Sequence, residues 1–187
     1  MQADKNILFL QNRVAYTKDE EAYKQLFFHF HPLLYRFAYN IIKNEEDAED
    51  IVSEVMIKVW TMENKLAYIN DLQLYLFKAV KNTAFTYLSS KKNSFQSLTD
   101  ETEQTLHTTS NNLSEQKIIF SEINQKIEKA VIALPPQCQM VFRLIKEEGM
   151  SHKQVSSILE ISQNTIETHM RIALKRIKLA LEKYLVG

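Results

Sequence analysis

The chain has 187 residues with 23 basic and 23 acidic side chains, so its formal net charge is zero, which argues against a protein that coats nucleic acid regardless of sequence. Only 2 glycines and 3 prolines occur while 45% of the residues are apolar, and this composition favours long helices around a core over turn-rich β structure. The single cysteine, Cys138, excludes an intramolecular disulfide and fits a cytoplasmic location, and the absence of a signal-peptide pattern or long apolar run predicts no membrane insertion.

The first part of the chain predicts helices. Residues 7–16 are expected to form a short apolar helix or arm. Thr17, with Glu20 three residues later, gives a capping-box pattern that would open the next helix. Apolar residues recur at helical spacing across 26–41, and Pro32 should kink or divide this helix.

The following helix, DAEDIVSEVMIKVW, has an apolar face and an acidic face. Asn44 is the expected N-cap, and acids in the first turn suit the positive end of the helix dipole. The acidic face would repel DNA, and no histidine joins it as a metal ligand, so we expect a protein partner there. The inward residues are Ala48, Ile51, Val52, Val55 and Val59, and the outward ones are Asp47, Asp50, Glu54 and Lys58.

A loop at 64–70 precedes a helix that reads DLQLYLFKAVKNTAFTYLSS. Basic or amide groups alternate there with aromatic ones, a combination that suits unpaired nucleic acid through backbone attraction and base stacking. An equally good interpretation places the aromatic rings in the core and leaves the lysines to solubilise the surface. The residues concerned are Tyr75, Lys78, Lys81, Asn82, Phe85 and Tyr87.

Composition changes at residues 91–113, which are rich in Ser, Thr, Asn and Gln and predict a flexible linker. A second helical domain should follow from residue 114. Pro135 and Pro136 would end its first helix and start the next, and Gly149 is a plausible stop. No His or Asp pattern marks Cys138 as a nucleophile, so it is interpreted as a small buried residue.

The stretch SHKQVSSILEISQNTIETHMRIALKRIKLAL predicts a helix–turn–helix. Ser151 and Gln154 form a capping box that opens the short first helix. The second helix has an apolar stripe and a polar stripe whose Asn, Thr and Arg side chains can hydrogen-bond base edges or phosphates. The alternative is an ordinary helix pair with a solvated basic face, but the short first helix and the polar stripe favour DNA binding. The apolar stripe is Ile166, Met170, Ala173 and Ile177, and the polar stripe is Asn164, Thr168, Arg171 and Lys175.

Three segments resemble, in order and spacing, the extracytoplasmic-function (ECF) sigma factors of bacterial RNA polymerase. They are DAEDIVSEVMIKVW, YLFKAVKNTAFTYL and LPPQCQMVFRLIKEEGMSHKQVSSILEISQNTIETHMRIALKRIKLAL. The resemblance runs from about residue 20 to residue 184. It implies a first domain that binds the polymerase clamp and captures the melted −10 promoter element. It also implies a second domain that binds the −35 element, and a linker that threads toward the active-site and RNA-exit region.

The same resemblance assigns roles to individual positions. The polymerase-binding helix would carry Asp47, Asp50, Ile51, Glu54, Val55, Lys58 and Trp60. The promoter-melting helix would carry Lys78, Lys81, Asn82 and Tyr87, and the 64–70 loop would hold a flipped-out base. The recognition helix would carry Gln163, Asn164, Thr165, Thr168, His169, Arg171 and Lys175. The family often has basic residues where Glu167 and His169 stand, which suggests modest DNA affinity without polymerase.

The sequence thus predicts an all-α protein of two small helical domains, 1–90 and 114–187, joined by the 91–113 linker. Its expected function is that of a sigma factor that binds core RNA polymerase and promoter DNA, with an anti-sigma factor as a further partner. No catalytic site, metal, cofactor or small-molecule substrate is expected, because no phosphate loop or Cys/His cluster occurs. The alternative is a two-domain helix–turn–helix regulator that binds duplex DNA without acting as a polymerase subunit; a helical hydrolase or transferase is disfavoured.

Overall fold

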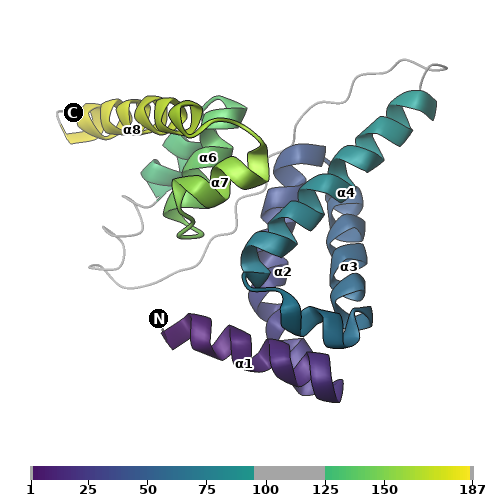
Figure 1. The fold of residues 1–187 in the computed structure, drawn as a ribbon. Helices are drawn as coiled ribbons and strands as arrows, with labels where there is room; N and C mark the ends of the chain where they lie inside the picture. Colours follow the sequence, from purple (N-terminus) through teal and green to yellow (C-terminus); the bar gives the residue numbers. More distant parts are fainter. Residues whose placement is uncertain (1, 95–124, 186–187) are drawn as a thin grey trace. The chain divides into compact units, whose positions relative to one another are not determined.

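The computed structural model describes residues 2–94 and 125–185, and all regular structure in these ranges is helical (Figure 1). The all-α prediction is therefore confirmed. The chain divides into two compact units between Ser94 and Phe95. The bounds are α1 Gln2–Thr17, α2 Glu20–Ile42, α3 Glu45–Thr61, the 3-10 helix η1 Glu63–Tyr68, α4 Leu72–Ser94, α6 Pro136–Lys146, α7 His152–Leu159 and α8 Gln163–Leu185.

In the first unit, α2, α3 and α4 pack against one another, and α1 lies against α2 and η1 (Figure 1). The apolar stripe expected in α2 forms the centre of this core, where Leu26, Phe30 and Leu34 are almost fully buried. Phe37 of α2 meets Phe77 of α4, with ring centroids 5.1 Å apart. Every inward residue expected in α3 is buried as well, so periodicity identified this face correctly.

The entry to α2 differs from the expected capping box. Thr17 is still part of α1, and its hydroxyl donates to the Arg13 carbonyl at 2.6 Å. Lys18 then adopts a left-handed conformation (φ 49°) that ends α1. The N-cap of α2 is Asp19, whose carboxylate accepts the Ala22 N–H at 2.9 Å, and this bond is the main cause of the lowered pKa of Asp19. Thr17 is therefore not a cap, because α1 ends at Thr17, one residue later than the sequence indicated.

Pro32 does not divide α2, which runs unbroken from Glu20 to Ile42. A proline removes one helical hydrogen bond and crowds the preceding turn. Phe30 and Leu34, on either side of it, are both completely buried. The helix is thus held by the core across the proline.

The second unit contains a helical segment at 125–132 followed by α6, α7 and α8. Pro135 caps α6 and Pro136 is its first residue, as expected. Gly149 adopts a left-handed conformation (φ +67°) just after α6, which suits a residue without a Cβ. The part of the predicted first helix before residue 125 lies outside the described residues. One core cluster of this unit contains Val131, Leu134, Cys138, Ala173 and Ile177.

The predicted domain boundary at residue 90 falls within a helix, since α4 continues to Ser94. Most of the expected 91–113 linker lies outside the described residues.

Candidate nucleic-acid and partner interfaces

The helix–turn–helix of the second unit is built from local signals that the sequence displays. The Ser151 side chain accepts the Gln154 N–H while the Gln154 side chain accepts the Ser151 N–H, a complete capping box at the start of α7. Glu160 ends α7 in a left-handed conformation (φ 57°). The Ser162 hydroxyl then accepts the Thr165 N–H at 3.1 Å, capping α8. Within the turn itself, the Ser156 hydroxyl of α7 donates to the Ile161 carbonyl at 2.6 Å. Side-chain hydrogen bonds therefore fix the turn from the α7 side and from the α8 side.

One face of α8 is buried and another is exposed, as the two stripes predicted. Ile166 and Ala173 are completely buried, and Met170 and Ile177 nearly so. The opposite stripe is solvent-exposed and presents amide, hydroxyl and cationic groups along one side of the helix. A stripe of this composition can hydrogen-bond base edges and neutralise phosphates. Its exposed members are Asn164, Thr168, Arg171 and Lys175, with Gln163 exposed at the start of the helix.

Two positions assigned to this face are engaged elsewhere. Thr165 is half-buried, and its hydroxyl lies 2.8 Å from that of Ser162. His169 is also half-buried, and its Nδ1 lies 3.3 Å from Sγ of Cys138 on α6. Burial raises the pKa of the Cys138 thiol, against the opposing effect of the Arg176 charge, so the thiol stays protonated and can donate to the imidazole. Both side chains thus contribute first to the structure of the unit.

The outer face of α3 is acidic, as expected. Asp50 and Glu54 are exposed, and Glu54 accepts a hydrogen bond from Lys58 at 2.5 Å. Ile57 lies on the same stripe and is 60% exposed, an apolar residue that the sequence analysis missed. It could have been found as the one apolar residue at helical spacing from Asp50 and Glu54. Acids around an exposed isoleucine suit a protein surface better than DNA.

Two residues assigned to polymerase binding lie inside the unit. Ile51 is 3% exposed and Val55 is 1% exposed, because both belong to the apolar stripe that faces α2 and α4. They can influence a partner only by holding α3 in place. Trp60 is half-buried, with its ring 5.0 Å from that of Tyr23, and it forms an aromatic edge at the end of the helix.

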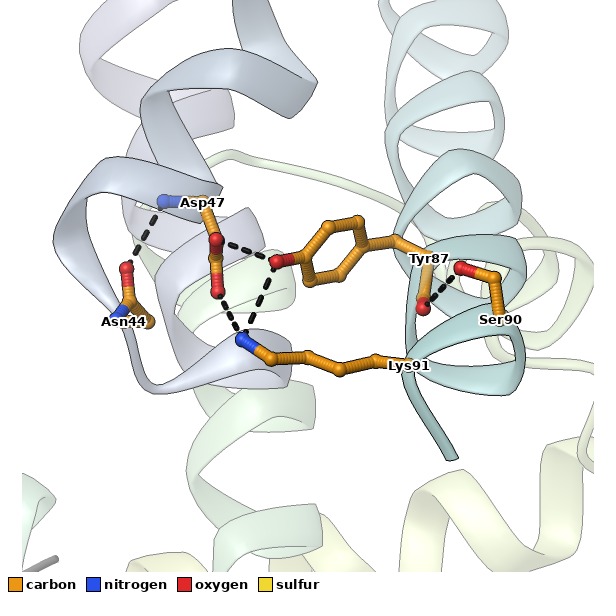
Figure 2. Close-up of polar contacts among 5 residues, drawn as sticks. All are labelled: Asn44, Asp47, Tyr87, Ser90 and Lys91. Atoms are coloured by element: carbon orange, nitrogen blue, oxygen red, sulfur yellow. Dashed lines mark hydrogen bonds and ion pairs between the residues drawn. The ribbon is translucent and has the colours of Figure 1, made fainter. Parts of the chain in front are cut away.

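A polar cluster joins the first turn of α3 to the last turns of α4 (Figure 2). The Tyr87 hydroxyl donates to Asp47 at 2.5 Å, and Lys91 Nζ lies 3.1 Å from the other carboxylate oxygen. The Tyr87 bond and the Lys91 charge lower the pKa of Asp47, while the bond to Asp47 raises that of Tyr87. Asn44 caps the same turn through the Asp47 N–H. Asp47, expected at a polymerase surface, and Tyr87, expected at a DNA surface, therefore bind each other.

The basic side chains of α4 are less exposed than expected. Lys81 is only 9% exposed, and its Nζ lies 5.6 Å from the centre of the Phe85 ring. Lys78 is half-buried, whereas Asn82 is exposed and Phe85 is 51% exposed. The accessible surface of α4 thus combines an amide with an aromatic ring, while Lys81 belongs to the packed interior of the unit.

The segment between α3 and α4 was expected to be a loop, but most of it forms the 3-10 helix η1, and we call residues 64–70 the 64–70 turn. Its exposed side chains are Asn64, Lys65, Tyr68 and Asn70. Its backbone is fixed from inside the unit by Gln11 of α1, whose amide donates to the Leu66 and Ile69 carbonyls. The only sign of this role in the sequence is that Gln11 is a lone amide at the end of the apolar run ILFLQ.

Known proteins resemble the chain along most of its length. A family model for sigma-70 region 2 matches residues 26–94, and one for sigma-70 region 4 matches residues 124–177, together about two thirds of the chain. RNA polymerase sigma factor SigV of Bacillus subtilis (strain 168) is 24% identical over 149 residues, covering 80% of this chain and 84% of that protein. ECF RNA polymerase sigma factor SigW of the same strain is 21% identical over 172 residues, covering 87% and 91%.

Solved structures share the fold. The sigma factor RpoE in complex with the anti-sigma factor NepR from Bartonella quintana matches with a TM-score of 0.59 at 20% identity, covering 85% of this chain and 96% of that one. CnrH in complex with the cytosolic domain of CnrY matches with a TM-score of 0.54 at 16% identity, covering 95% and 98%. The chain contains a sigma-70 region 2 segment followed by a region 4 segment. This arrangement disfavours the alternative hypothesis, a helix–turn–helix regulator that does not act as a polymerase subunit. The chain belongs to the ECF sigma factors of the sigma-70 family, which bind core RNA polymerase and direct promoter-specific transcription initiation.

Proposed function

We propose that the two units divide promoter recognition between them. The first unit, for which the sequence predicts the bounds 1–90, binds core polymerase and captures the melted −10 element. The second, 114–187, binds the −35 element as duplex, and residues 91–113 connect them. The observation that carries this proposal is the exposed stripe of Asn164, Thr168, Arg171 and Lys175 on a helix whose opposite stripe is buried.

On α8 the base-reading and phosphate-binding groups are Gln163, Asn164, Arg171 and Lys175. Thr168 adds a hydroxyl that already donates to the Asn164 carbonyl at 2.9 Å and therefore serves DNA as an acceptor. Thr165 and His169 support the helix rather than contact bases. Arg171 is the strongest candidate for a bidentate contact, since its guanidinium is exposed in the middle of the stripe.

The polymerase surface is the outer face of α3, made by Asp50, Glu54, Ile57 and Lys58. The exposed isoleucine supplies apolar contact and the surrounding charges supply orientation and selectivity. Trp60 extends this surface at the end of the helix. Asp47 acts differently, because its carboxylate is directed to Tyr87 and Lys91.

Strand opening is proposed to occur at α4 and the turn before it. Asn82 and Phe85 on α4, with the exposed side chains of the 64–70 turn, supply hydrogen-bonding and stacking groups for unpaired bases. Binding energy for the unpaired strand would offset unstacking, which costs a few kcal/mol for a flipped base. Such a mechanism needs no catalytic group in this chain, and no cluster of three or more potential metal ligands occurs within 2–94 and 125–185.

An anti-sigma protein is proposed as a regulator. RpoE and CnrH, which share this fold, were solved with an anti-sigma factor and with the cytosolic domain of CnrY, respectively. A protein that covered Ile57 and the acids of α3 would exclude polymerase. We also propose that the chain acts in the cytoplasm, where polymerase and promoter meet; no described helix is long and apolar enough to cross a membrane.

The test is run-off transcription with the full chain and bacterial core polymerase on a library of promoter-length fragments with randomised upstream elements. The expected result is specific transcripts from a subset of fragments that share two short conserved elements. Sequence-specific binding of the free chain to duplex DNA, without any effect on transcription by core polymerase, would contradict the proposal.

A further inference from the structure

Gln11 is a polar side chain in the interior of the first unit. It is 2% exposed, and its Nε2 donates one hydrogen bond to the Leu66 carbonyl at 2.7 Å and another to the Ile69 carbonyl at 2.8 Å. Because both acceptors are carbonyl oxygens, the amide nitrogen must face them, and both of its protons are used. A single residue of α1 thus holds two points of the backbone more than fifty positions later.

The two carbonyls lie on either side of Tyr68. Leu66 is completely buried, and its carbonyl also accepts the Ile69 N–H at 3.2 Å. Lys18 forms an ion pair of 2.7 Å with Glu63 at the other end of η1. In contrast to this fixed backbone, the Tyr68 side chain is 79% exposed.

An exposed aromatic ring on a fixed backbone is suited to stacking. Stacking of a base on an aromatic side chain is largely independent of sequence, because every base has a π-face. A ring whose backbone is already ordered loses less conformational entropy on binding than a ring on a mobile loop. The neighbouring Asn64, Lys65 and Asn70 are also exposed and supply hydrogen bonds and a positive charge for the attached backbone.

We propose that Gln11 is a positioning residue for capture of an unpaired base, holding the backbone on both sides of Tyr68 so that the phenol ring stacks on that base. This inference rests on the proposed function of the 64–70 turn in binding the melted strand. Gln11 lies outside residues 26–94, the segment matched to sigma-70 region 2, so the proposal makes α1 part of the strand-opening apparatus of this chain.

The experiment measures the affinity of the reconstituted holoenzyme for a single strand. The probe is the fluorescein-labelled non-template strand across the melted segment of a promoter selected by run-off transcription. The variants are Tyr68→Ala, Tyr68→Phe, Gln11→Met and the double variant Gln11→Met with Tyr68→Ala. The control Gln25→Met makes the same change at an exposed position of α2. Affinity of each variant for core polymerase is measured in parallel.

Tyr68→Ala should lower single-strand affinity by roughly 5-fold to 150-fold, the range for loss of one stacked base, while Tyr68→Phe should retain wild-type affinity. Gln11→Met alone should lower single-strand affinity at least threefold. In the double variant, Gln11→Met should cause little further loss beyond that caused by Tyr68→Ala. Core affinity should stay within twofold for all variants, and Gln25→Met should resemble the wild type.

Two results would overturn the inference. One is a Tyr68→Ala holoenzyme that binds the strand as well as the wild type. The other is a Gln11→Met substitution that reduces single-strand affinity and core affinity by the same factor, whether residue 68 is tyrosine or alanine. Such a result would indicate a purely structural role for Gln11. A wild-type holoenzyme that transcribes but does not bind the strand would instead refute the proposed function of the turn, and the inference with it.

Discussion

Replacing Asp47 with asparagine should uncouple the start of α3 from the end of α4. The Asp47 carboxylate accepts a hydrogen bond from the Tyr87 hydroxyl at 2.5 Å and lies 3.1 Å from Lys91 Nζ (Figure 2). The substitution removes its negative charge but keeps the size of the side chain. A hydrogen bond to a charged group contributes about 1.5–3 kcal/mol. The Asp47 side chain is 18% exposed and Lys91 46% exposed, so solvent weakens the pair. We therefore expect a loss of about 1–2 kcal/mol.

Urea unfolding followed by tryptophan fluorescence measures this loss in the intact chain. Trp60 is the only tryptophan and lies in the first unit against Tyr23, so its emission reports the unfolding of that unit. With an m-value of about 1–3 kcal/mol/M, the midpoint of urea unfolding should fall by roughly 0.3–2 M. The control Glu46→Gln removes another acid of the same first turn and should change the midpoint much less.

A double-mutant cycle with Tyr87→Phe isolates the contact itself. The two substitutions should be non-additive by about 1 kcal/mol, since each removes the same hydrogen bond. Additivity within about 0.3 kcal/mol would refute the claim that Asp47 acts through Tyr87.

The same cluster predicts a dependence on pH. The Tyr87 bond, assisted by Lys91, lowers the pKa of Asp47 in the folded state. The contribution of Asp47 is therefore complete above its unfolded pKa of about 3.9 and is lost as pH falls through the lower folded value. The hydrogen bond to Asp47 raises the pKa of Tyr87 in the folded state. The stability that the protonated Tyr87 hydroxyl contributes is therefore complete below about pH 10 and is lost as pH rises through the higher folded value. Asp47→Asn should flatten the acid limb of the stability curve; an unchanged acid limb would contradict the assignment.

Three further substitutions test the other surfaces. Arg171→Ala should weaken holoenzyme binding to the upstream element by about 1–3 kcal/mol if the guanidinium contacts a base, and an unchanged footprint would remove Arg171 from the contact set. Asp50→Lys should reduce core affinity by about tenfold through charge reversal on the α3 face, without altering the affinity of the free chain for upstream duplex; full transcription by this variant would refute the assigned surface. His169→Ala should lower the free energy of unfolding of the second unit by about 1 kcal/mol, because the contact with Cys138 is lost, and thermal unfolding measures this change. The same substitution should reduce DNA affinity less than Arg171→Ala does.

Local patterns predicted the helices and much of their burial. The buried stripe of α8, the capping box at Ser151 and the proline start of α6 were all visible in the sequence, since each depends on residues within about three helical turns of one another. The cap of α2 was missed because Thr17 and Asp19 are both good N-caps, and the choice between them depends on where α1 ends.

Contacts between distant segments could not be predicted in this way. Tyr87 and Asp47 are separated by 40 positions, and each has its own plausible surface role when its helix is considered alone. Lys81 was expected in solvent because a lysine usually is, but its stem packs into the unit and its amine approaches Phe85. The buried amide of Gln11 likewise gains its meaning only from two carbonyls in another segment.

The proposal that the first unit binds the melted −10 element and the second unit binds the −35 element is tested most directly by a footprint of the reconstituted holoenzyme on a selected promoter. The footprint is combined with permanganate probing of unpaired thymines. If the two units divide promoter recognition, the holoenzyme should protect an upstream element and produce a separate permanganate-reactive segment downstream, and both should require core polymerase. Arg171→Ala should weaken the upstream protection at a given holoenzyme concentration. A footprint that is identical with and without core polymerase, and shows no reactive thymine, would contradict the proposal.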